Sequence, residues 1–265
     1  MMTPHCMIAG PDDGPAIVLI GSLGTTLNMW EPQIAAFSVD HRVVAVDLPG
    51  HGGTPTPARP PTVASYAEEV IALLDAHNIE LFSVVGLSFG GAVAQVLAAR
   101  HPHRVTSAVI AASAPAFDPA FWRARARAVR RDGLAAVLEL TSRRRFSETF
   151  LSAHPDVAAA SLRELATMDP AGYAACCDAL ASFTHPMAQQ IAAPTLIIAG
   201  SDDVVTPPRL AREIALLVSG ARLQVLPRAG HLVSLEQPQR FNDLIGSHLR
   251  STGSRTNRGW TPLRR

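Results

Sequence analysis

Three short segments of the chain place a hydroxyl, a carboxylate and an imidazole in an order that suits nucleophilic catalysis. The pattern G-x-S-x-G at 86–90 holds Ser88 between glycines, an acidic pair follows a later apolar run, and His231 lies in a glycine-marked loop. A serine hydroxyl attacks a carbonyl when a base removes its proton and an acid orients that base. We therefore predict Ser88 as the nucleophile, Asp203 as the orienting acid and His231 as the base. The spacing from the preceding glycine and the following prolines favours Asp203 over Asp202.

The glycines around Ser88 have a mechanical reason. A strand that turns abruptly into a helix holds its turn residue in a strained backbone conformation, and side chains on either side of it would collide. Such a turn presents the Ser88 hydroxyl at a helix N-terminus, where backbone N–H groups favour negative charge. Each candidate also has a simpler interpretation. Ser88 could lie in an ordinary glycine-rich turn, Asp203 could be a helix cap or a loop charge, and His231 could be an ordinary loop histidine. The order and context of all three favour the catalytic interpretation.

A catalytic serine also needs donors for the oxyanion of the tetrahedral intermediate. The backbone N–H of Phe89, directly after the nucleophile, is the first predicted donor. The loop 21–24, which follows an apolar run, supplies the second, and we predict the N–H of Leu23.

The elements that must position these residues follow from hydrophobic patterning. Nearly continuous apolar runs predict buried strands, and helical patterns such as 63–78 and 92–101 lie between them. The predicted strands are 16–20, 42–47, 81–86, 104–112, 194–200 and 221–227. This alternation predicts an α/β fold with a mostly parallel central sheet and helices on both faces. Ser88, Asp203 and His231 all fall just past the carboxyl ends of strands, where such sheets carry their sites.

The alternation of predicted strands and helices stops between about 117 and 190, where the sequence is helical and rich in arginine. We predict a helical cap insertion at 117–190 over the carboxyl edge of the sheet, with 1–116 and 191–250 forming the core. The polar and basic segment 251–265 is expected to be a disordered tail.

Composition excludes several classes of protein. The 265 residues are 48% hydrophobic and 17% charged with a net charge of +1, which argues against disorder and against a broad polyanion-binding face. The sequence contains no lysine, which excludes Schiff-base catalysis through lysine. Three cysteines without a C-x-x-C pair, no apolar stretch long enough for a bilayer and no signal-peptide pattern at 1–16 predict a cytoplasmic protein. We expect neither nucleic-acid nor membrane partners, no metal site and no organic cofactor; the oligomeric state stays open.

Several segments together resemble the α/β-hydrolase superfamily, whose catalytic residues follow the order Ser…Asp…His. More narrowly, the chain resembles the 3-oxoadipate enol-lactonases of the β-ketoadipate pathway of aromatic degradation. The matching segments are 21–34, 46–54, 86–95, 170–181, 191–208 and 229–238. S-L-G-T-x-L-x-M-W and G-Y-A-x-C-C are the most selective patterns among them. The resemblance implies an α/β-hydrolase fold with a helical cap, and a serine hydrolase that opens a lactone ring through an acyl-enzyme without a cofactor.

The resemblance also bears on substrate binding. It implies roles for Trp122 and Arg125, which match a W-x-x-R pattern of these lactonases, and for Arg145, which stands where relatives often have tryptophan. A carboxylate-bearing substrate would need a cation, and the insertion offers many arginines, each of which could equally belong to a solvated helical face. These arginines are Arg123, Arg125, Arg127, Arg130, Arg131, Arg143, Arg144 and Arg145.

Two departures from the lactonase pattern keep other functions open. They are Arg145 itself and Leu48-Pro49, where many relatives have an arginine. The same catalytic residues would serve a carboxylesterase, another lactonase or a carbon–carbon bond hydrolase, and a haloperoxidase-like or perhydrolase activity is a further alternative. A non-catalytic binding protein on this scaffold is the alternative of a different class.

Overall fold

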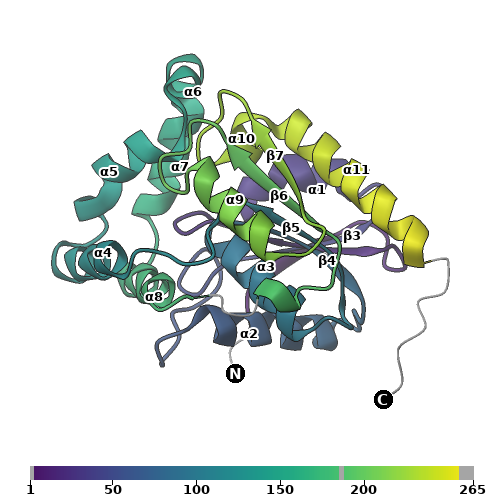
Figure 1. Cartoon of the computed structure of the whole chain (residues 1–265). Helices are drawn as coiled ribbons and strands as arrows, with labels where there is room; N and C mark the ends of the chain where they lie inside the picture. The colour runs from purple at the N-terminus through teal and green to yellow at the C-terminus, as the bar shows by residue number, and fades with distance from the viewer. Residues whose placement is uncertain (1–2, 185–187, 257–265) are drawn as a thin grey trace.

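The structure, a computed structural model, describes residues 3–184 and 188–256. Its strands form one seven-stranded sheet (Figure 1). The strands are β1 (Cys6–Ala9), β2 (Ala16–Ile20), β3 (Arg42–Val46), β4 (Phe82–Leu87), β5 (Val105–Ala111), β6 (Thr195–Gly200) and β7 (Arg222–Leu226). They lie in the order β1-β3-β2-β4-β5-β6-β7, and every neighbouring pair is parallel except β1 with β3. The predicted mostly parallel sheet is confirmed.

Both faces of the sheet are buried. Alternate residues of β2 point to opposite sides, so Ile17 and Leu19 join one apolar cluster while Val18 and Ile20 join the other. The first cluster lies under α1 (Glu31–Phe37), α10 (Val233–Glu236) and α11 (Pro238–Thr256), and the second lies under α2 (Val63–Ala76), α3 (Phe89–Arg100) and α9 (Pro208–Leu217). Burial on both sides explains why these strands are almost continuously apolar in sequence.

The order of the strands places the candidate site. The chain passes from β2 to β3 on one side, and then returns to place β4 on the other side of β2. Parallel sheets bind ligands outside the carboxyl ends of the strands, at such a reversal. The loop after β2 and the turn after β4, which carry Leu23 and Ser88, are therefore neighbours.

A helical insertion separates β5 from β6 and forms the left side of the molecule in Figure 1. Its helices are α4 (Pro119–Asp132), α5 (Ala135–Arg145), α6 (Glu148–Ala153), α7 (Pro155–Ala166) and α8 (Pro170–Ala181). Helix α4 packs along α8, and α8 approaches the loop after β3 so closely that a Cβ on Gly172 would lie 2.4 Å from the Cα of Gly50. The insertion is thus packed directly on a loop at the carboxyl edge of the sheet.

Two parts of the chain differ from the expectation. Strand β1, half-exposed and only four residues long, was not among the predicted strands because its apolar run is the shortest of the seven. Helix α11 continues to Thr256, so residues 251–256 are helical and do not belong to a disordered tail. In this polar segment the hydroxyls of Ser251 and Thr252 donate to the carbonyls of His248 and Leu249, three residues earlier in the helix. The remaining tail residues, 257–265, lie outside the described residues.

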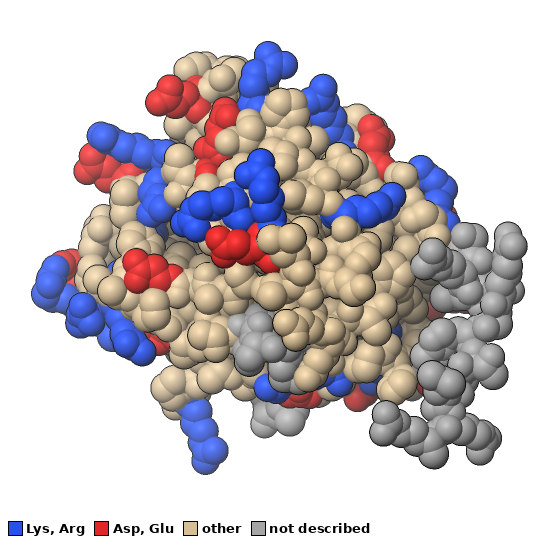
Figure 2. Space-filling view, in the orientation of Figure 1, with Lys and Arg blue, Asp and Glu red and all other residues tan. Residues whose placement is uncertain are grey.

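The surface carries both signs of charge. Figure 2 shows basic and acidic side chains interspersed over the face seen in Figure 1. On the insertion, Arg130 pairs with Asp178 and Arg143 pairs with Glu139. Within the described residues, no helix combines the length and the apolar character needed to cross a bilayer.

Candidate active site

Ser88 occupies a sharp turn between β4 and α3. Its backbone φ is +60°, in the left-handed region that residues other than glycine rarely adopt, and its N–H donates to the carbonyl of Ala111 at 2.8 Å. A Cβ on Gly86 would lie 2.0 Å from the carbonyl oxygen of Gly90, and a Cβ on Gly90 would lie 1.9 Å from that of Ile20. The turn therefore requires both glycines, as the G-x-S-x-G pattern predicted.

The three predicted catalytic side chains form a hydrogen-bonded chain. Ser88 Oγ lies 2.9 Å from His231 Nε2, and His231 Nδ1 lies 2.9 Å from Asp203 Oδ2. All three residues are at most 4% exposed. The carboxylate of Asp202 is exposed and accepts a hydrogen bond from the adjacent Ser201 hydroxyl, so the acid that the structure brings to His231 is Asp203, which the spacing favoured.

The carboxylate of Asp203 is saturated with donors. Its Oδ1 accepts from the N–H groups of Val205 and Thr206, and its Oδ2 accepts from the Thr206 hydroxyl as well as from His231 Nδ1. Burial acts to raise the pKa of this carboxyl, but attraction to His231 and these hydrogen bonds outweigh it and lower the pKa. Asp203 is therefore ionised at neutral pH and holds the imidazole proton on Nδ1, which leaves Nε2 free to accept a proton.

Two backbone N–H groups near Ser88 are available as oxyanion donors. In the part of the chain that the structure describes, neither the Leu23 nor the Phe89 amide has a hydrogen-bond partner. Gly90 N–H donates to the carbonyl of Gly21 at 3.0 Å, which ties the loop after β2 to the start of α3. The two predicted donors thus belong to segments that are bonded to each other.

His51 fixes the same loop from the other side. Its Nε2 accepts from the N–H of Gly24 at 3.0 Å and its Nδ1 donates to the carbonyl of Pro49 at 2.9 Å. Complete burial lowers the pKa of His51 to about 4, so the ring is neutral and can accept this bond. Leu48, the neighbouring departure from the lactonase pattern, is buried in the core and does not reach the site.

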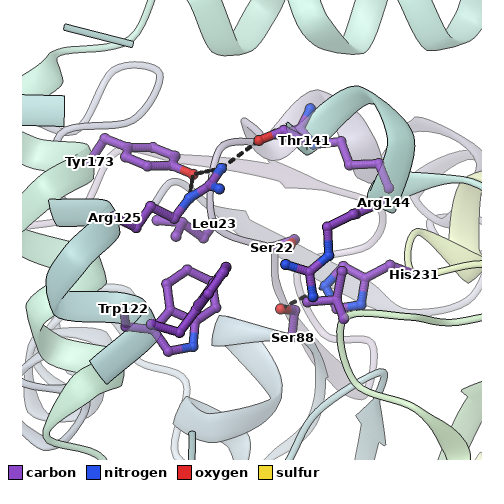
Figure 3. Close-up of a pocket in the computed structure, with 12 residues that line it drawn as sticks. Ser22, Leu23, Ser88, Trp122, Arg125, Thr141, Arg144, Tyr173 and His231 are labelled. Atoms are coloured by element: carbon purple, nitrogen blue, oxygen red, sulfur yellow. Dashed lines mark hydrogen bonds between the residues drawn. The ribbon is translucent and has the colours of Figure 1, made fainter. Parts of the chain in front are cut away.

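A small cavity opens next to Ser88. It has a volume of about 50 Å³ and is bounded by Ser88, His231 and Leu23 from the core and by Trp122 and other residues of the insertion. Figure 3 shows the insertion residues facing the Ser88–His231 pair across this space. The wall contains three arginines and, among the described residues, no acidic side chain.

Arg125, a predicted substrate-binding residue, lies in this wall beside Trp122. Its Nε and Nη2 donate to the Tyr173 hydroxyl at 2.9 and 2.7 Å, and Nη2 also donates to the Thr141 hydroxyl (Figure 3). Burial raises the pKa of Tyr173 to about 12, so the phenol is neutral at physiological pH. Tyr173 and Thr141 were not predicted as site residues, although Tyr173 belongs to the selective G-Y-A-x-C-C pattern.

Arg145, the second predicted substrate-binding arginine, contacts the cavity but is anchored in the protein. Its Nη1 donates to the carbonyl and hydroxyl of Ser161 at 2.9 and 2.6 Å, and its Nη2 donates to the carbonyl of Gly24 at 2.5 Å. Burial lowers its pKa to about 10, which leaves the guanidinium charged at neutral pH. The side chain therefore links the insertion to the loop that carries Leu23.

The other arginines that the sequence analysis named in the insertion separate into two groups. Arg144 also lines the cavity, and sequence reasoning named it only as part of an arginine run. The others are exposed and lie outside the cavity wall: Arg123, Arg127, Arg130, Arg131 and Arg143.

The two adjacent cysteines of the insertion are free thiols in a buried environment. Cys176 and Cys177 are buried, and burial raises the pKa of Cys177 to about 12 and that of Cys176 well above its ordinary value. Within the described residues, no group of three or more histidine, cysteine or acidic side chains is arranged to hold a metal ion.

This fold and this arrangement of serine, histidine and aspartate define a class of protein. The sequence profile of the "alpha/beta hydrolase fold" family matches residues 15–238, and the chain belongs to that family. Two 3-oxoadipate enol-lactonases of Acinetobacter baylyi are each 36% identical to it, one over 89% of both chains and the other over 94% of both. The crystal structure of the enol-lactonase from Burkholderia xenovorans LB400 superposes with a TM-score of 0.90 at 33% identity, covering 93% of this chain and 96% of that one.

Proposed function

We propose that this chain is a serine hydrolase that opens the ring of 3-oxoadipate enol-lactone, a step of aromatic degradation, through an acyl-enzyme. The hydrogen-bonded chain Ser88–His231–Asp203 beside a small arginine-lined cavity is the observation that carries the proposal. Similarity to enol-lactonases over nine-tenths of the chain supports this substrate among those that the family hydrolyses.

In the first half of the reaction, His231 Nε2 takes the proton of Ser88 as Oγ attacks the lactone carbonyl. The oxyanion of the tetrahedral intermediate accepts hydrogen bonds from the Leu23 and Phe89 N–H groups. Asp203 stays ionised and stabilises the imidazolium that forms. Collapse breaks the ring carbon–oxygen bond, and the leaving oxygen departs as an enolate, a better leaving group than an alkoxide.

In the second half, His231 protonates the enolate and becomes a base again. The enol, which is part of the acyl chain still bound to Ser88, relaxes to a ketone. His231 then takes a proton from water, whose oxygen attacks the acyl carbonyl, and collapse returns the proton to Ser88. This cycle uses no metal and no organic cofactor.

The helical insertion is the element to which we assign substrate selection. We propose that 117–190 acts as a cap over a core formed by 1–116 and 191–250, with Trp122 and Arg125 facing the substrate and Arg145 supporting the wall. Side chains of the insertion and of the core line the same cavity, so the insertion contributes directly to the space next to Ser88. The free cysteines fit the reducing cytoplasm as the site of action.

The test follows the ultraviolet absorbance of the enol-lactone, generated in situ, with wild type and with Ser88→Ala. Rapid loss with wild type alone supports the proposal, whereas full turnover by Ser88→Ala refutes it. If the lactone persists while an activated ester is cleaved, the chain is a hydrolase of another substrate, such as a carboxylesterase. If no ester is cleaved and a fluorophosphonate fails to label Ser88, a binding protein on this scaffold is favoured.

A further inference from the structure

The three arginines of the cavity wall differ in how far the protein already uses their donors. Arg125 donates three times to the hydroxyls of Tyr173 and Thr141. Arg145 donates three times to Ser161 and Gly24. The guanidinium of Arg144 makes a single hydrogen bond within the described residues, from Nη2 to the carbonyl of Val204 at 3.1 Å. Most of the N–H donors of Arg144 are thus available to a ligand.

Arg144 is held in place without being neutralised. Its guanidinium carbon lies 5.1 Å from the centre of the Phe121 ring, and its other contact is a neutral carbonyl in the loop that carries Asp203. Figure 3 shows the side chain descending from α5 toward Ser88 and His231, which line the same cavity. The side chain is therefore aimed at the site by contacts that leave its charge unpaired.

The surroundings of Arg144 favour an anion. Partial burial and repulsion from Arg125 lower the pKa of Arg144, and attraction to Asp203 opposes them. Asp203 lies outside the cavity wall and is itself engaged with His231 and Thr206, and the wall holds no acidic side chain among the described residues. A carboxylate entering the cavity would compensate this surplus of positive charge, and charge-assisted hydrogen bonds from Arg144 would offset the cost of its leaving water.

We propose that Arg144 binds the carboxylate of the substrate and selects esters and lactones that carry a carboxylate a few carbons from the scissile carbonyl. The inference rests on the proposed function, because it places a substrate of that class in the same cavity. The planar guanidinium offers paired N–H groups that match the two oxygens of a carboxylate. Arg144 thereby fixes which end of the substrate faces Ser88.

The helix itself supplies a matched control. Arg143, one residue earlier in α5, is exposed and pairs with Glu139 on the outer surface. The variants Arg144→Gln and Arg143→Gln remove the same charge from neighbouring positions, one inside the cavity and one outside it.

The experiment compares two activated esters of similar length, mono-p-nitrophenyl succinate and p-nitrophenyl butyrate, which differ in the terminal carboxylate. The measured quantity is kcat/KM for the charged ester divided by kcat/KM for the neutral one. Arg144→Gln is expected to lower this ratio about 10- to 100-fold, mainly through KM, as loss of a charge-assisted hydrogen bond does. Arg143→Gln should leave the ratio at the wild-type value, and Arg144→Lys should recover part of it.

Two outcomes would decide against Arg144. Equal losses of kcat/KM for both esters would mean that Arg144 supports the Asp203 loop and does not bind the carboxylate. An unchanged ratio in Arg144→Gln would also overturn the inference. Because both probes are esters, a fall in the ratio without any lactone turnover would sustain Arg144 as the carboxylate receptor and refute the proposed lactone.

Discussion

Replacing Asp203 by asparagine tests the catalytic arrangement with almost no change in shape. Oδ1 of Asp203 accepts from two backbone N–H groups, which cannot rotate away. The amide oxygen of asparagine must therefore take that position, which places the NH2 group toward His231 Nδ1 and the Thr206 hydroxyl. The hydroxyl can turn and accept, but the imidazole must move its proton from Nδ1 to Nε2.

The magnitude follows from that change of tautomer. A histidine protonated on Nε2 donates to Ser88 and cannot remove the serine proton, although Ser88 and His231 keep their positions. Loss of the correct tautomer in a Ser-His-Asp arrangement lowers kcat by roughly 10,000-fold. That factor corresponds to a barrier higher by about 5.5 kcal/mol. Binding of substrate should change far less, because the aspartate lies behind the histidine and outside the cavity wall.

The assay measures kcat and KM for p-nitrophenyl butyrate with wild type, Asp203→Asn and Asp202→Asn. Asp202 is exposed and one residue away, so its variant makes the same chemical change outside the hydrogen-bonded chain. We expect the large loss in Asp203→Asn alone. If Asp203→Asn keeps more than about a tenth of wild-type kcat, far above the roughly 10,000-fold loss expected, or if Asp202→Asn is the inactive variant, the assignment of the acid is wrong.

Three further predictions concern the parts that hold the site. Between about pH 6.5 and pH 4 the unfolded chain binds a proton at His51 that the folded protein does not bind, so the free energy of unfolding should fall by about 3 kcal/mol as the pH drops through this range. Urea unfolding at several pH values should show a weaker dependence in His51→Gln, and an equally steep one would contradict the buried neutral imidazole. Arg145→Lys keeps the charge, but a lysine at this position cannot reach all of the acceptors that Arg145 uses, so the Gly24 loop loosens. We expect kcat to fall about tenfold for charged and neutral esters alike, which is less than the loss caused by removing an oxyanion donor. A loss confined to charged esters would instead make Arg145 a substrate receptor. Gly172→Ala brings a Cβ within 2.4 Å of the backbone of Gly50 and should destabilise the fold by about 1–3 kcal/mol, read as a lower Tm; an unchanged Tm would show that α8 can move aside at no cost.

The sheet could be predicted from the sequence because burial on both faces leaves a strong signal. Strands β2 to β6 are almost wholly buried, as in Ala16–Ile20, where every residue is buried. Edge strand β1 gives a weaker signal, because its apolar run is only four residues long and half-exposed and the strand pairs on one side only. Helix α11 extends past the predicted core into a polar segment, and hydrophobic patterning does not detect a helix that continues without an apolar stripe.

The residues of the hydrogen-bonded chain could be predicted because each depends on a local pattern. Ser88 needs glycines on both sides for a turn with positive φ, and the G-x-S-x-G pattern shows this requirement within five consecutive residues. Asp203 and His231 follow strands whose ends must meet at one edge of a parallel sheet. The sequence did not show that the Thr206 hydroxyl also bonds to the acid, because a threonine in a loop has many possible partners.

The arginines of α5 show where sequence patterning ends and packing takes over. Consecutive residues of a helix point about 100° apart, so Arg143, Arg144 and Arg145 must face three different surroundings. Which one faces the cavity depends on the rotation of the helix, and an apolar stripe normally reveals that rotation. The buried stripe of α5 is Val137, Thr141 and Arg145, spaced four residues apart and mostly polar. Because Thr141 bonds to Arg125 and Arg145 bonds to Gly24, polar partners from distant segments take the place of an apolar core. The rotation that turns Arg144 toward Ser88 is therefore set by tertiary hydrogen bonds, which the sequence of α5 alone does not contain.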